Sequence, residues 1–227
     1  MARHWIKVIS ISYCLLLNGC SQTSKDAIDT IVASVAGKSP PISLKEIEAT
    51  PYAALIAHLN DNAEALMILT WIEPSTPAKT YKWLSADKEM LATKAGRIVK
   101  TINLKAGNLS AIISEQDDPL SLNILLPDVK RTWSYKLSWS PGYHRQYSAT
   151  SRFSILGKET ITHFERALEL VHISENVSLS EIDFQYTNHF WLIPSSGEVV
   201  KSQQHPYPGA DTINLLLPHF FMGSTNG

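Results

Sequence analysis

The sequence predicts a mainly antiparallel all-β domain, formed as a barrel or half-barrel-like sheet and preceded by one or two short N-terminal helices. After Asn62 the chain is a series of short apolar runs, about ten residues apart, that are rich in β-branched and aromatic side chains and separated by Gly or Pro. No strand pattern alternates with a long helical pattern, which argues against a parallel α/β sheet. Closure of so many strands would remove the edges at which sheets aggregate.

Two segments ahead of the strands are candidates for the short helices. In residues 25–36 the apolar side chains recur at the i, i+3, i+4 and i+7 spacing of an amphipathic helix, and Gly37 offers a C-cap. Residues 51–59 can form the second helix. His58 lies in that segment beside apolar neighbours and has no partner at ligand spacing. It is therefore interpreted as a packed or capping histidine rather than a metal ligand.

The apolar runs define the predicted strands in chain order. They cover residues 65–73, 79–84, 90–93, 98–102, 109–114, 133–140, 146–156, 159–163, 167–174, 184–193, 199–203 and 212–217. The segments MLATKAGRIVKT (90–101) and WLIPSSGEVVKS (191–202) align without gaps. Each predicts a strand, a glycine-containing turn and a second strand, because glycine supplies the positive φ of a tight hairpin.

The N-terminus resembles a bacterial lipoprotein signal. Arg3 and Lys7 flank an apolar stretch, 8–17, that is shorter than the about 20 apolar residues needed to span a bilayer. The stretch ends in Leu-Asn-Gly-Cys, which resembles a lipobox and implies cleavage before Cys20 and acylation of that cysteine. Two or more acyl chains anchor a protein stably. Ser21 implies sorting to the outer membrane. The alternative is a plain signal peptide followed by a chance cysteine.

Cleavage before Cys20 would divide the chain into a signal peptide (1–19), a lipidated tether with a short helix (20–41) and a single antiparallel β domain (42–227). Loss of Arg3 and Lys7 leaves 18 basic and 21 acidic residues, a formal net charge of −3. Nucleic-acid-binding proteins instead carry a basic surface. Because Cys14 leaves with the signal peptide, no free thiol remains, which excludes a disulfide framework and thiol catalysis.

The sequence contains none of the catalytic motifs that would indicate an enzyme. Gly-x-Ser-x-Gly, His-Glu-x-x-His and glycine-rich phosphate loops are missing, and no histidine pairs at a spacing that indicates a metal site. Asp117 and Asp118 precede Pro119 and are interpreted as turn starters. His163 and Glu165 lie close together, but this spacing is common on one face of a strand. We expect no enzyme activity, cofactor or metal.

Aromatic and basic side chains are concentrated in residues 132–153. Four alternate residues from Trp133 to Trp139 are apolar and share one strand face, and residues 140–143 form a predicted turn. One interpretation places these aromatic rings in the core. The other is a polysaccharide-binding surface, on which rings stack against sugars and arginines bind acidic groups. The candidate residues for binding glycan or a partner are Trp139, Tyr143, Arg145, Arg152 and Trp191.

Four segments together resemble the YjbF-type lipoproteins, a family that includes the GfcB-like group 4 capsule polysaccharide lipoproteins. They are ISLKEIEATPYAALIAHL (42–59), KWLSADKEMLATKAGRIVKT (82–101), TWSYKLSWSPGYHRQYSATSRF (132–153) and NHFWLIPSSGEVVKSQQ (188–204). Ile193 departs from the family's Tyr-Trp-Val-Asp-Pro pattern, which puts in doubt a polar role at this position. The resemblance implies a barrel-like periplasmic domain that takes part in making or exporting exopolysaccharide, and it assigns no catalytic residue.

We therefore expect an outer-membrane lipoprotein whose domain faces the periplasm and acts as a non-enzymatic accessory in capsule or exopolysaccharide production or export. Its expected partners are the membrane, through the acyl chains on Cys20, and polysaccharide-export or assembly proteins, with polysaccharide itself as a further candidate. One alternative is a half-barrel carrier that binds lipid or a lipid-linked glycan. Another is a structural subunit that binds neither.

Overall fold

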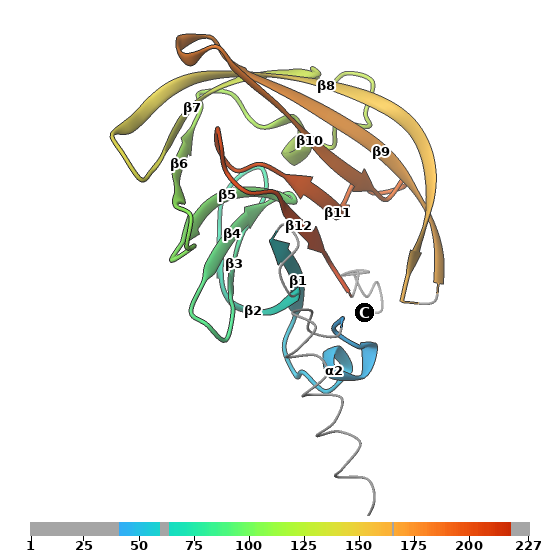
Figure 1. Ribbon diagram of the computed structural model, residues 1–227. Coiled ribbons are helices and arrows are strands. Elements are labelled where there is room, and N and C mark those ends of the chain that lie inside the picture. The colour runs from blue at the N-terminus through green and yellow to red at the C-terminus, as the bar shows by residue number, and fades with distance from the viewer. Residues whose placement is uncertain (1–40, 60–63, 165, 219–227) are drawn as a thin grey trace, which may run out of the picture. The chain divides into compact units, whose positions relative to one another are not determined.

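Twelve antiparallel strands form one continuous sheet that curves into a nearly closed barrel, so the expected all-β fold is confirmed (Figure 1). The computed structural model describes residues 41–59, 64–164 and 166–218. Within these ranges there is one α-helix, α2 (Leu44–Glu48), and two 3-10 segments, η1 (Pro119–Leu122) and η2 (Ser180–Ile182). None of the described helices has the length and apolar character needed to cross a membrane. The predicted helix at 25–36 lies outside the described residues.

Most of the predicted strand segments are present, with differences at β1, β8 and β9. The strands are β1 (Ala54–Leu59), β2 (Glu64–Glu73), β3 (Thr80–Leu84), β4 (Met90–Lys94), β5 (Arg97–Ile102), β6 (Asn108–Ile113), β7 (Thr132–Ser140), β8 (His144–His163), β9 (Arg166–Leu179), β10 (Phe184–Leu192), β11 (Val199–Gln204) and β12 (Ile213–Leu216). Figure 1 shows β8 and β9 as two long, strongly bent strands.

The sheet starts and ends with strands that are neighbours in the chain. Its order is β5-β4-β3-β2-β1-β12-β11-β10-β9-β8-β7-β6, so the first strand pairs with the last in the middle of the sheet. The two edges, β5 and β6, meet through side chains. The backbone N–H of Leu109 donates to Thr101 Oγ1 at 2.9 Å, and the N–H of Leu104 donates to Asn108 Oδ1 at 3.0 Å. Side-chain acceptors therefore take the place of ladder partners at this seam.

The predicted helix at 51–59 is wrong, because residues 54–59 form β1. This strand is paired on both sides, with β2 and with β12, and its first four side chains are buried. Burial of both strand faces removes the polar–apolar alternation by which a strand is recognised. The helix of this region lies earlier, at α2. It begins with a capping box in which Ser43 accepts from the N–H of Glu46 and the Glu46 carboxylate accepts from the N–H of Ser43.

Two other predictions are corrected or refined by the backbone. Residues 146–156 and 159–163, predicted as separate strands, form the single strand β8, with a register shift between Ile155 and Gly157. The glycine marks a β-bulge rather than a break. The two aligned hairpins are both present, but β4–β5 turns tightly at Ala95 and Gly96, whereas β10–β11 is joined by a longer loop that contains Gly197.

Alternation along β7 explains how the aromatic segment is used. Trp133, Tyr135, Leu137 and Trp139 are all buried and point into the barrel, as their spacing predicts, while Lys136 lies on the exposed face. These side chains join one large apolar core with residues of β1–β5 and β8–β12. Burial of this core supplies the main driving force for closure of the sheet.

Candidate functional site

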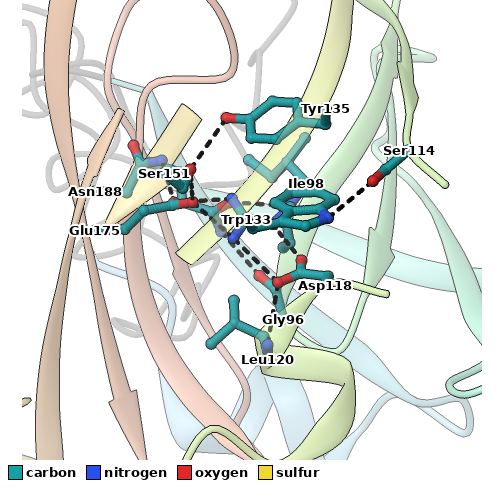
Figure 2. A network of polar contacts seen from close by, with 12 residues as sticks. Gly96, Ile98, Ser114, Asp118, Leu120, Trp133, Tyr135, Ser151, Glu175 and Asn188 are labelled. Carbon is teal, nitrogen blue, oxygen red and sulfur yellow. Dashed lines mark hydrogen bonds and ion pairs between the residues drawn. The ribbon is translucent and has the colours of Figure 1, made fainter. Parts of the chain in front are cut away.

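A charged side chain lies inside the barrel. Arg97 is the first residue of β5, and its side chain is only 3% exposed. Its Nη1 and Nη2 atoms donate to the Glu175 carboxylate on β9 at 2.8 and 2.9 Å, and its Nε donates to Asp118, the N-cap of η1. Bidentate arginine–carboxylate pairs are among the strongest polar contacts in proteins. Figure 2 shows Glu175 and Asp118 on opposite sides of this network.

Further polar groups complete the network around Glu175. The hydroxyl of Ser151 on β8 donates to Oε1 at 2.5 Å, and the amide of Asn188 on β10 donates to Oε2 at 2.9 Å. The Asn188 Oδ1 atom in turn accepts from the N–H of His205 at 2.8 Å. A buried carboxylate is costly unless it is both paired and hydrogen-bonded, and here it is both.

Three aromatic rings surround the guanidinium of Arg97. Its Cζ atom lies 4.9 Å from the ring centre of Trp133, 5.5 Å from Phe190 and 5.8 Å from Phe153. These are cation–π distances. Through this one side chain the edge strand β5 is joined to β7, β8, β9 and β10 on the other side of the barrel.

One guanidinium faces two carboxylates in this network, and the pKa values reflect that balance. Burial alone would lower the pKa of Arg97, but Asp118 and Glu175 outweigh it and raise that pKa well above its ordinary value. Burial raises the pKa of Asp118; Arg97 opposes this shift and the charge of Glu175 adds to it. The arginine stays charged at every physiological pH, which suits a structural cross-link better than a proton-transfer group.

A pocket of about 310 Å³ opens at one end of the barrel. Its apolar walls come from one part of the sheet, on both sides of the β1–β12 pair. They include Leu55 of β1, Tyr81 and Trp83 of β3, Val199 of β11 and Leu215 of β12. All five side chains belong to the core cluster or pack against it. The pocket is thus the part of the barrel interior that the core does not fill.

Polar groups of this pocket come from the connecting segments and from β11. Lys79, Glu198 and Lys201 line it, together with Ser121 of η1. The Ser121 Oγ atom is buried and has no hydrogen-bond partner among the described residues. Burial raises the pKa of the Glu198 carboxyl above its ordinary value. The Lys201 ammonium lies over the ring of Trp191, which is not part of this lining. The polar side chains named here therefore leave Lys79 as the cation of the pocket, beside one weakened acid and one unsatisfied hydroxyl.

Close contacts join the β4–β5 turn to β11 beside the pocket. Gly96 lies directly against Val199, and a Cβ atom added to Gly96 would be 2.4 Å from the Val199 Cβ. The Gln204 amide donates to the Gly96 carbonyl at 2.8 Å, and its Oε1 accepts from the N–H of Ile98 at 2.9 Å. The two hairpins that align in sequence thus contact each other in space.

The five candidate binding residues occupy different surroundings. Trp139 is buried, and its ring stacks on His144 at a centroid distance of 4.4 Å. Tyr143, in the β7–β8 turn, is 93% exposed, and Arg145 beside it is also exposed. Arg152 is exposed farther along β8. Cys20, the predicted acylation site, lies outside the described residues. Of the five, only Tyr143 and Arg145 lie close together and exposed, Tyr143 in the β7–β8 turn and Arg145 at the start of β8.

Trp191 is enclosed in a separate cluster on β8–β11. One face of its ring stacks on His172 at 4.4 Å, the Lys201 ammonium lies 4.3 Å from its ring centre, and its indole N–H donates to Glu159 at 2.8 Å. His172 Nε2 is also hydrogen-bonded to His189 Nδ1 at 3.0 Å. These partners occupy the Trp191 ring, so a sugar could stack there only by displacing them.

The His172–His189 pair predicts a loss of stability in mild acid. Burial lowers the pKa of both histidines. At His172, Glu159 opposes this shift and Lys201 adds to it. At His189, the nearby His172 and His205 lower the pKa further. The unfolded chain therefore takes up protons near pH 6.5 before the folded protein does, and stability falls as the pH drops below that value.

We expect the melting temperature to fall between pH 7 and pH 5, and to fall less in a His189→Gln variant. Melting curves at several pH values measure this, with His58→Gln on β1, a histidine outside this pair, as the control. Equal pH slopes in wild type and His189→Gln would contradict the assignment.

The buried network is the feature that sequence reasoning missed. The interpretation of Asp118 as a turn starter is confirmed, since its Oδ1 accepts from the N–H of Leu120 at 3.0 Å. Nothing in the sequence around Asp118 indicated its second role, as an ion-pair partner of Arg97. Glu175 did give one, because it occupies the same strand face as the buried residues Ile173 and Val177. A charged residue in phase with apolar neighbours indicates a buried, paired group.

The described residues contain no group of three or more His, Cys, Asp or Glu side chains placed to hold a metal ion. What they do contain is a nearly closed antiparallel barrel with a buried ion-pair network and an apolar pocket at one end. The chain belongs to the YjbF family: residues 28–217 match the family described as "Group 4 capsule polysaccharide lipoprotein gfcB, YjbF".

Curated relatives and one solved structure agree with this membership. The chain is 31% identical to the "Uncharacterized lipoprotein GfcB" of Escherichia coli (strain K12) over 87% of this chain and 90% of that protein. It is 29% identical to the "Uncharacterized lipoprotein YjbF" of the same organism, over 88% and 91%. The crystal structure of the hypothetical lipoprotein YmcC from Escherichia coli (K12) is similar with a TM-score of 0.68 at 29% identity, covering 83% of this chain and 93% of that one. The resemblance inferred from the sequence is therefore confirmed.

Proposed function

We propose that this protein is a non-enzymatic accessory in the production or export of capsule or exopolysaccharide. Acyl chains on Cys20 anchor it in the outer membrane, and the β domain faces the periplasm. The observation that carries the proposal is the family match over residues 28–217, because the description of that family names a capsule polysaccharide lipoprotein. Its partners are polysaccharide-export or assembly proteins and the polymer itself.

The β7–β8 turn is the proposed contact surface. Tyr143 and Arg145 are exposed there, next to Gly142, whose φ of 95° sets the turn. Between them His144 stacks on the buried Trp139 with an interplanar angle of 4°, which fixes the turn on the barrel. An exposed ring can stack on a sugar and an arginine can bind an acidic group of the polymer or of a partner protein. The hairpin thus presents both groups on a rigid support.

Deletion of the gene is expected to reduce surface polysaccharide under conditions in which the locus is expressed. Wild-type protein should restore it. A Cys20→Ser protein should not, because it lacks the acyl chains that keep the domain at the membrane. Quantification of surface polysaccharide in these three strains, with membrane fractionation, tests the proposal. Unchanged polysaccharide after deletion would overturn it.

A double variant, Tyr143→Ala with Arg145→Ala, is expected to lose binding of the partner protein or the glycan while its free energy of unfolding stays the same. Exposed substitutions usually change the free energy of unfolding by less than about 0.5 kcal/mol. The readout is a pull-down of tagged lipidated protein from detergent-solubilised envelope, assayed for export proteins and for glycan. The matched control is Tyr52→Ala with Lys105→Ala, which removes another exposed tyrosine and cation. Recovery equal to wild type in the double variant would exclude the turn as the contact surface.

A further inference from the structure

The pocket at the barrel end has the size and walls of a site for an unbranched apolar chain. Its volume of about 310 Å³ is at the lower end of the range for small-molecule sites. At about 30 Å³ for each water-sized group, it holds roughly ten such groups. Leu55, Trp83, Val199 and Leu215 are each less than 9% exposed and form a preformed wall. The N–H of Trp83 is satisfied by Thr93 at 2.9 Å, so this ring adds no unpaired donor to the lining.

The polar groups of the pocket favour an acidic head group. Lys79 lines it together with one carboxyl, Glu198, for which burial disfavours the charged form. Ser121 adds a buried hydroxyl that has no partner in the described part of the chain. A carboxylate or phosphate with an adjoining oxygen would pair with the Lys79 ammonium and accept from this hydroxyl.

The opening of the pocket lies at a defined end of the barrel. Leu55 stands at the start of β1, Ala78 precedes β3, and Leu217 follows the end of β12. The opening is therefore at the barrel end where the chain enters the sheet. In the sequence, the residues before β1 lead from Cys20, whose acyl chains the proposed function places in the membrane. The link between the pocket and the membrane rests on that proposal.

We propose that the pocket binds one acyl chain of an anionic amphiphile, with about ten methylene groups inside the barrel and the acidic head group at Lys79 and Ser121. The chain is held by apolar burial against β1, β3, β11 and β12. The head group fixes its orientation. This assigns a ligand class to a cavity that the accessory role does not use.

Calorimetric titration tests the proposal. The mature chain, with serine at position 20, is titrated with straight-chain fatty acids from C6 to C14, each kept below its micelle concentration. Affinity should rise about fourfold for each added methylene and level off near ten to twelve carbons, when the pocket is full. A rise that continues unchanged to C14, or no dependence on length, would overturn it. Charge reversal by Lys79→Glu should weaken the binding of decanoate about threefold and leave the binding of decanol unchanged.

An Ala78→Trp variant should abolish decanoate binding by filling the opening from a loop. The matched control is Ala106→Trp, which places the same ring in an exposed turn outside the pocket. Melting curves should show both variants folded. Decanoate binding by Ala78→Trp equal to that of the control would overturn the assignment.

Extraction of the protein purified from envelopes identifies the source of the natural chain. An acyl compound recovered from wild type and lost in Ala78→Trp supports the site, and its head group distinguishes a free acid, a phospholipid and an acylated glycan. Equal recovery from both overturns it. The polysaccharide assay is separate, so loss of capsule on deletion together with failed titration would reject the pocket and retain the accessory role.

Discussion

Replacing Arg97 with methionine is expected to lower the free energy of unfolding by about 3–5 kcal/mol, the cost of removing one partner from a buried ion pair. The substitution keeps most of the side-chain volume but leaves Asp118 and Glu175 without their cation in the barrel interior. Urea unfolding followed by tryptophan fluorescence measures this loss, since Trp133 lies against Arg97. The loss should be smaller at pH 5 than at pH 8, because burial raises the pKa of Asp118 and Arg97 is no longer there to oppose that shift.

The control for this variant is Arg152→Met, which removes an exposed arginine from the outer face of β8. It should change stability by no more than about 0.5 kcal/mol. A loss below about 1 kcal/mol in Arg97→Met would show that apolar packing alone closes the barrel. The Arg97→Lys variant should fall between wild type and Arg97→Met, since it keeps the charge without the bidentate geometry.

Gly96→Ala is expected to cost about 3 kcal/mol, from two separable causes. The residue has a φ of +81°, a conformation that costs a non-glycine residue about 1–2 kcal/mol. The added Cβ atom would also lie 2.4 Å from the Val199 Cβ, and such overpacking typically costs about 1–3 kcal/mol. Chemical denaturation of the variant measures the sum.

Gly209→Ala separates the two causes. Gly209 has nearly the same φ, +79°, but nothing lies within 4 Å of an added Cβ atom. It should therefore show the backbone cost alone, about 1–2 kcal/mol. Equal losses at the two positions would mean that Val199 moves aside freely and that the contact between the β4–β5 turn and β11 is loose.

Most of the sheet could be predicted because its strands are buried on one face only. In β7 every second side chain faces the core, and this alternation alone indicates both the strand and its orientation. Alternation fails where both faces are covered, as in β1, and there the sequence predicts a helix instead. Gly157 is read as a break for a related reason, since a bulge and a chain break both require a residue that tolerates unusual backbone angles.

The candidate sites were less predictable because they are made by closure of the sheet. Arg97, Asp118 and Glu175 meet only when β5, η1 and β9 are folded around the same interior. Trp191 is a reasonable candidate from the aromatic residue alone, but strand pairing places His172 opposite it and covers its ring. The prediction that Tyr143 lies in a turn is confirmed, and its exposure follows from the turn itself.

The pairing of β1 with β12 sets the order in which this protein can acquire its fold. Ile56 lies opposite Leu216, so two ends of the domain meet in the middle of one sheet. Contacts between such distant residues must overcome a large loop-closure entropy, and proteins dominated by them fold slowly, in milliseconds to seconds. Under the proposed localisation, the chain enters the periplasm with its N-terminus first. One edge of β1 would then stay unpaired until β12 has crossed the membrane. Export would then precede folding, and the exposed edge of β1 is the segment that a periplasmic chaperone would have to protect.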